Sequence, residues 1–168
     1  MIKRNCFYSF HYIPDNWRAG TIRSIGSIEG NEPTSDNDWE KIKNNGDKAI
    51  KDWINSQMDN KSCVIVLIGS ETANRKWINY EITTGWNNQK GVVGIYIHGF
   101  LNKDRDPSYK GKNPFENITF NQSTKKLSSI VKCYDPPGAD SKEKYKWISN
   151  NIAAIVEEAI RVRRNFKP

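Results

Sequence analysis

The sequence predicts an α/β protein with a parallel sheet of about five strands and helices on both faces of that sheet. Residues 63–68, Cys-Val-Ile-Val-Leu-Ile, form an unbroken apolar run of the kind found in a central strand covered on both sides. Short apolar runs also alternate along the chain with segments whose apolar residues recur at the helical period. This alternation favours parallel strands joined by crossover helices.

Strands are expected wherever a short apolar run is bounded by polar residues, glycine or proline. A further strand is expected between residues 27 and 34, where the apolar signal is too short to give bounds. The four clear strands are expected at residues 5–10, 63–68, 92–97 and 130–134.

Helices are expected where apolar residues fall on one stripe. The first runs from about residue 16 to 27 and uses Trp17, Thr21, Ile22 and Ile25. The second runs from 39 to 57 behind cap candidates that include Asp36; Gly46 inside it lowers helix propensity by about 1 kcal/mol and should mark a close approach to a neighbour. A third helix covers 75–82, and a last apolar stripe spans 145–160.

Length and composition predict one domain over residues 1–168. No run reaches the roughly 18 apolar residues that cross a bilayer, and no signal peptide precedes the first strand, so we expect a cytoplasmic protein without membrane contact. Cys6, Cys63 and Cys133 each fall in an expected strand and are interpreted as buried free thiols.

The net charge of +7 raises the question of a polyanionic partner. Arg161, Arg163, Arg164 and Lys167 form a basic tail, but elsewhere basic residues alternate with acidic ones, and no nucleic-acid-binding signature occurs. A solvated basic tail is therefore favoured, and a polyanion-binding module ranks last among the functional hypotheses.

Ligands of open parallel sheets bind outside the carboxyl ends of the strands. The expected strands end in Ser9, Phe10 and His11, in Gly69 and Ser70, and in His98. The loop after the first strand lacks glycine, which excludes a dinucleotide fingerprint and a P-loop. The two histidines are candidates for hydrogen bonding or proton transfer, and no metal site is expected because a third ligand at metal spacing is missing.

The helix at residues 75–82 carries the most informative acid. Ile78 and Ile82 should face the sheet, and Glu81 falls at the edge of that arc, one turn after Trp77. A partly desolvated carboxylate beside an aromatic ring would be a good partner for a cation. The alternative is that Glu81 only pairs with Arg75 or Lys76 and that Trp77 only packs.

Several segments together resemble a known family. The segments 7–12 and 15–18, the central run 64–70, the helix 75–82, the run 93–97 and Asn-Pro-Phe at 113–115 are similar to the TIR-like proteins of the Thoeris anti-phage defence system. The similarity spans about residues 4–118, and it implies a flavodoxin-like, TIR-like fold. Only the combination of segments is specific, because the spacing W-x-x-x-E occurs widely.

The resemblance implies an enzyme that uses NAD as its substrate and needs no cofactor. Enzymatic TIR domains cleave the nicotinamide–ribose bond, and some convert the remaining ADP-ribose into a cyclic or conjugated signal that activates a separate effector. The catalytic glutamate of the family matches Glu81. Ser9, Phe10 and His11 match the lip of the nucleotide pocket, and Ser70, Trp77, Arg18 and Asp36 are placed with them by location.

The chemistry agrees with a single carboxylate. Nicotinamide carries the positive charge while it is bonded to the ribose of NAD and leaves as a neutral molecule, so a general acid is not required, unlike in ordinary glycoside hydrolysis.

The segment of residues 99–126 is longer than usual connections and is expected to be a lid or an ordered insertion. The alternative from another functional class is a non-catalytic TIR-like adaptor that acts through association of protein chains; self-association is expected in either case.

Overall fold

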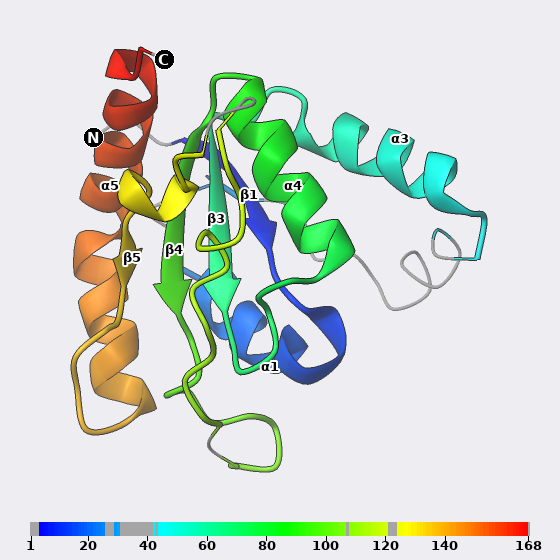
Figure 1. Cartoon of the computed structure of the whole chain (residues 1–168). Helices are drawn as coiled ribbons and strands as arrows, with labels where there is room; N and C mark the ends of the chain where they lie inside the picture. The colour runs from blue at the N-terminus through cyan, green and yellow to red at the C-terminus, as the bar shows by residue number, and fades with distance from the viewer. Residues whose placement is uncertain are drawn as a thin grey trace.

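A five-stranded parallel sheet in the order β2-β1-β3-β4-β5 forms the centre of the molecule (Figure 1). The structure is a computed structural model that describes residues 4–25, 29–30, 42, 44–106, 108–120 and 124–167. This order is that of flavodoxin-like sheets, so the predicted fold class is confirmed. The strands are Asn5–Ser9 (β1), Glu29–Gly30 (β2), Cys63–Ile68 (β3), Gly91–Tyr96 (β4) and Cys133–Tyr134 (β5).

The two central strands, β3 and β4, are buried along their whole length, as their apolar runs predict. The short strand expected between residues 27 and 34 is β2. The strand expected at 130–134 is only partly right, because a 3-10 helix, Leu127–Ser129 (η1), and a turn precede it. The chain reaches the sheet only at Cys133, which pairs with Gly94.

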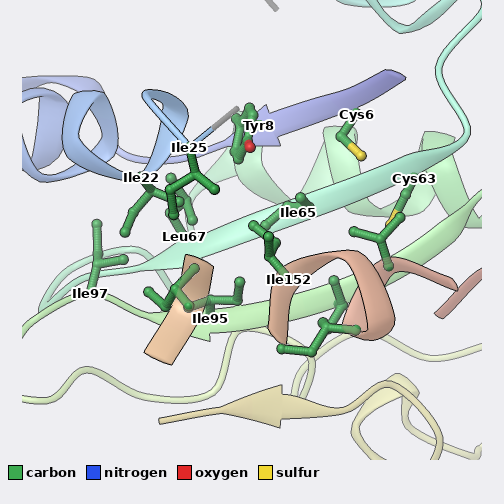
Figure 2. Packing of buried hydrophobic residues seen from close by; sticks show 14 of the residues in the cluster. Cys6, Tyr8, Ile22, Ile25, Cys63, Ile65, Leu67, Ile95, Ile97 and Ile152 are labelled. Atoms are coloured by element: carbon green, nitrogen blue, oxygen red, sulfur yellow. The ribbon is translucent and has the colours of Figure 1, made fainter. Parts of the chain in front are cut away.

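Helices cover both faces of the sheet (Figure 1). On one face, α1 and α5 bury an aliphatic layer with β1, β3 and β4, in which Ile22, Ile65, Ile95 and Ile152 meet (Figure 2). On the other face, α3 and α4 cover a second layer. The helices are Tyr12–Arg23 (α1), Asp47–Met58 (α3), Lys76–Asn87 (α4) and Ser141–Asn165 (α5).

Two helix predictions need correction. A continuous helix through Gly46 is wrong: this glycine has φ +89 and caps the start of α3, since a positive φ interrupts a right-handed helix. The close approach expected at Gly46 is wrong as well, because a Cβ there would meet no described atom within 4 Å. Trp39 and the cap candidate Asp36 lie outside the described residues. The first helix begins earlier than expected, at Tyr12, and ends at Arg23. Its buried side is made of Asp15, Arg18, Ala19 and Ile22, so the expected stripe is wrong at Trp17, which is 59% exposed.

The connection between β4 and β5 replaces a helix with irregular but packed chain. Phe115, Ile118, Phe120 and Leu127 are buried in the same layer as α3 and α4. Phe120 also stacks with Phe166 after the end of α5. Of the two alternatives for residues 99–126, the structure therefore supports an ordered insertion for the part that packs on the sheet.

The end of α5 differs from the expected solvated tail. Arg163 is buried, donates from Nε to the carbonyl oxygen of Trp86 at 2.8 Å, and stacks on the Trp86 ring.

The expectation of free thiols is confirmed, with Cys6 and Cys63 buried and Cys133 half-buried. Among the helices of the described residues, none combines the length and apolarity needed to span a membrane.

Candidate active site

The order of strands reverses between β1 and β3, and this switch point is where open parallel sheets bind ligands. Ser9 is the last residue of β1, and the chain after β3 leads into α4, which carries Glu81. The hydrogen bond between the two side chains places Glu81 beside the carboxyl end of β1, at the switch. Figure 1 shows α4 packed beside the sheet.

The packing of α4 on the sheet sets the position of Glu81. Ile78 and Ile82 are buried against the sheet, as predicted, and Trp86 is buried with them. Gly85 lets the helix approach closely, since a Cβ there would lie 2.5 Å from Val64 Cγ2. With the helix held this close, the side chain one position before Ile82 reaches the end of β1.

Glu81 and Ser9 form a buried hydrogen-bonded pair. The Ser9 hydroxyl donates to Oε2 of Glu81. Ser9 is fully buried, and Glu81 is 8% exposed, which is more buried than its expected place at the edge of the apolar arc. The close packing of α4 on β3, at Gly85 and Val64, explains the difference, because it brings the Glu81 side chain against the end of β1.

Burial raises the pKa of Glu81 to about 8, and the hydrogen bond from Ser9 opposes this rise. The expected alternative of an ion pair with a neighbour on the helix is not found: Lys76 pairs with Asp47, and Arg75 donates to the carbonyl oxygen of Glu71. In the described part of the chain, no cation faces the carboxyl. At neutral pH it is mostly protonated, and an arriving positive charge would favour its ionisation.

The other residues expected at the pocket are divided between two locations. Trp77 is half-buried on the same face as Glu81, with its ring edge-on to Tyr80 at 5.9 Å between centroids. Ser70 is half-buried just beyond β3. Phe10 packs instead with the layer of α1 and α5, and Arg23 lies over its ring. The structure therefore does not bring Phe10 to Glu81.

The two histidines lie at strand ends, as expected, and both are half-buried. Burial lowers the pKa of His11 and of His98, so each imidazole is mainly neutral near pH 7. His11 is close enough to Arg75 and Glu71 for their charges to act on it, which puts it beside the start of α4.

Arg18 is buried in an ion pair with Asp15, and Asp36 lies outside the described residues. Burial raises the pKa of Asp15 to about 6, against the opposing charge of Arg18. Asp15 was not predicted from the sequence as a site residue. Its spacing of three residues from Arg18 on one helix was the available signal, because such residues are neighbours on a helix surface.

The described residues contain no cluster of three His, Cys, Asp or Glu side chains that could hold a metal ion. The polar groups near the switch include the buried carboxyl of Glu81, the hydroxyl of Ser9 and the mainly neutral imidazole of His11. Such a set can bind hydroxyl groups and stabilise a developing positive charge.

Comparison with known proteins agrees with this architecture. Residues 7–102 match the family model described as Thoeris protein ThsB, TIR-like domain. The chain is also 34% identical over 129 residues to a candidate cyclic ADP-D-ribose synthase, ThsB1, of Bacillus cereus (strain MSX-D12), an overlap of 74% of this chain and 67% of that protein. With its sheet order and its matched residues, this chain belongs to the ThsB family of TIR-like Thoeris proteins.

Proposed function

We propose that this protein cleaves the nicotinamide–ribose bond of NAD and forms an ADP-ribose-derived signalling nucleotide in anti-phage defence. The observation that carries the proposal is the buried carboxyl of Glu81, which has a hydroxyl partner and no cation beside it in the described chain. The name of the Bacillus cereus relative, a candidate cyclic ADP-D-ribose synthase, supports a cyclic product.

The positive charge of the substrate explains why the site needs only one acid. The nicotinamide ring of NAD carries a formal positive charge, and its arrival beside Glu81 favours the carboxylate form. As the glycosidic bond breaks, positive charge moves onto the ribose, and a carboxylate in a dry site stabilises that charge strongly. Nicotinamide departs neutral, so no proton donor is required.

Ser9 keeps the carboxylate in one orientation during this step. Its hydroxyl bonds to Oε2, which leaves Oε1 for a ribose hydroxyl or for the developing charge. Glu81 is buried, and exclusion of water from its surroundings favours attack on the ribose by a group of the same nucleotide over hydrolysis. The product would diffuse to a separate effector.

Incubation with NAD tests the proposal directly. Wild type, Glu81→Gln and the matched control Glu71→Gln are assayed as purified proteins and in extracts of phage-infected cells; Glu71 is an exposed acid on the same rim. Nicotinamide release is followed by chromatography and the nucleotide product by mass spectrometry. We expect Glu81→Gln to lose about 100-fold or more in rate and Glu71→Gln to stay within twofold. Equal activity of wild type and Glu81→Gln, or no release by wild type in either sample, would show that the proposal is wrong.

Association of protein chains is a second candidate function, favoured by two exposed apolar side chains on α1. Ile13 is 81% exposed and Trp17 is 59% exposed, and the two lie one helical turn apart. An adaptor that works through this face would lose association with Trp17→Glu and would release no nicotinamide as wild type. Light scattering and the NAD assay on the same samples separate the two functions.

A further inference from the structure

A buried ion pair lies at the same end of the sheet as Glu81. Asp15 and Arg18 are on the first turns of α1, directly after β1, and are 1% and 4% exposed. Their Oδ1 and guanidinium nitrogen are 3.4 Å apart. Burying two charges is expensive unless further hydrogen bonds satisfy them, so the partners of each group show what the pair holds.

Arg18 binds both ends of a tight turn that follows β4. Its Nε donates to the carbonyl oxygen of Phe100 at 2.7 Å, and a terminal nitrogen donates to that of Asp106 at 3.0 Å. The other terminal nitrogen donates to the carbonyl oxygen of Pro14 and to Oδ1 of Asp15. A guanidinium has five N–H groups, so these contacts leave little capacity for a phosphate of the substrate.

The 100–106 turn is closed by its own hydrogen bonds. The Oδ1 of Asn102 accepts from the backbone N–H groups of Asp104 and Asp106, both at 2.9 Å. The N–H of Asn102 donates to the carbonyl oxygen of Asp106 at 3.1 Å. Because these bonds close the turn and Arg18 binds on both sides of it, the turn is held as one unit.

Asp15 connects the same pair to β3. Its Oδ2 packs against Gly69, the residue after β3, where a Cβ would lie only 2.1 Å from that oxygen. Its backbone N–H donates to the carbonyl oxygen of His11, just beyond β1. The ion pair thus contacts the chain that follows β1, β3 and β4, the three strand ends that surround the switch point.

We propose that Asp15 and Arg18 form a clamp that holds the 100–106 turn at the rim of the nucleotide pocket, and that both are positioning residues for the reaction. The proposal rests on the proposed function, since it treats the turn as a wall of the NAD site. Arg18 thereby acts through backbone carbonyls and not by contact with the substrate, which replaces its expected role as a binding residue. Loosening the turn weakens the retention of NAD more than the chemical step on Glu81.

Arg18→Lys is the variant that tests the clamp. Lysine keeps the charge beside Asp15 but lacks the planar fork that spans the carbonyls of Phe100 and Asp106. The matched control is Arg163→Lys, another buried arginine that donates to a backbone carbonyl. It lies near the end of α5, just after Ala159 and Ile160, which pack against Gly91 at the start of β4. A second variant, Asn102→Ala, opens the turn from outside without touching the buried pair.

Hydrogen exchange and steady-state kinetics are measured on all four proteins. In Arg18→Lys and Asn102→Ala we expect exchange across residues 100–108 to be at least tenfold faster, and KM for NAD to rise at least fivefold with kcat within twofold. The acid limb of the pH profile, set by Glu81, should keep its midpoint. Arg163→Lys should leave exchange in this segment and KM unchanged.

The two proposals fail in different ways. If both turn variants keep wild-type exchange and KM, or if kcat falls while KM is unchanged, the clamp is wrong. If the wild type releases no nicotinamide, the proposed function is wrong, and hydrogen exchange alone tests the clamp. Faster exchange at residues 100–108 in Arg18→Lys but not in Arg163→Lys supports the clamp. Equal exchange in the two variants overturns it.

Discussion

Replacing Glu81 by glutamine should stabilise the fold at alkaline pH while removing activity. Glu81 is buried, and burial raises its pKa to about 8 from an ordinary value near 4.5. Glutamine has the same shape, stays neutral at every pH, and still offers an oxygen to the Ser9 hydroxyl. The variant therefore removes the penalty of a buried charge and retains the packing of α4.

The size of the effect follows from the two pKa values. Below about pH 4.5 the carboxyl is protonated in the folded and unfolded states alike, and its contribution to stability is fully present. Between pH 4.5 and 8 the unfolded chain releases the proton and the folded chain keeps it, so stability falls by about 1.4 kcal/mol per pH unit. From pH 5 to pH 8 the loss in the wild type is on the order of 3 kcal/mol, and Glu81→Gln does not undergo it.

Denaturant unfolding at pH 5 and pH 8 measures this difference, with Glu71→Gln as an exposed control. The stability gained by Glu81→Gln over wild type should be on the order of 3 kcal/mol larger at pH 8 than at pH 5, which corresponds to roughly 2–4 °C in Tm for each kcal/mol. Glu71→Gln changes an exposed side chain, and its effect on stability should differ far less between the two pH values than that of Glu81→Gln. A gain from Glu81→Gln that does not grow with pH would refute the reasoning, because the carboxyl would then be as well solvated in the folded state as in the unfolded one.

Three further substitutions test other parts of the structure. Ser9→Ala removes the hydrogen bond that lowers the pKa of the Glu81 carboxyl, so the acid limb of the rate profile should move to higher pH and kcat/KM at pH 7 should fall about tenfold. An unmoved profile would contradict this coupling. Gly69→Ala would place a methyl group 2.1 Å from Oδ2 of Asp15 and should destabilise the fold by about 1–3 kcal/mol, measured by urea unfolding. The control Gly20→Ala has open space around it and should be neutral or stabilising. Phe115→Ala should cost about 3–5 kcal/mol in the same measurement, since the ring is fully buried beneath the irregular β4–β5 connection; a loss below 1 kcal/mol would mean that this connection is not part of the core.

The elements with the strongest local signal were predicted best. The run Cys63–Ile68 became β3 with the expected bounds, since a short run of six apolar residues bounded by polar residues or glycine is typical of a strand covered on both faces. The buried stripe of α5 was equally clear. The strand at β5 was overestimated, because its apolar residues pack on the sheet partly through a 3-10 turn, and a two-residue strand leaves almost no periodic pattern.

The candidate site was predicted in part. Ser9 and Glu81 were both selected from the sequence, and the structure joins them in one hydrogen bond. Phe10 follows Ser9 but packs on the opposite face, because successive side chains of a strand alternate between faces. Arg18 and Arg163 were expected at the surface or at the ligand, and both are buried donors to backbone carbonyls.

The sequence by itself determined which segments form strands and helices, to which family the chain belongs and which acid occupies the helix after the central strand, since these depend on local pattern and residue identity. Only the tertiary structure decided how deeply Glu81 is buried, which hydroxyl bonds to it and what Asp15 and Arg18 hold. Burial and hydrogen bonding depend on residues that are far apart in the sequence. Ser9 and Glu81 are 72 positions apart, and Arg18 and Asp106 are 88 positions apart. No local pattern contains those neighbours, because the packing of the helices on the sheet brings them together.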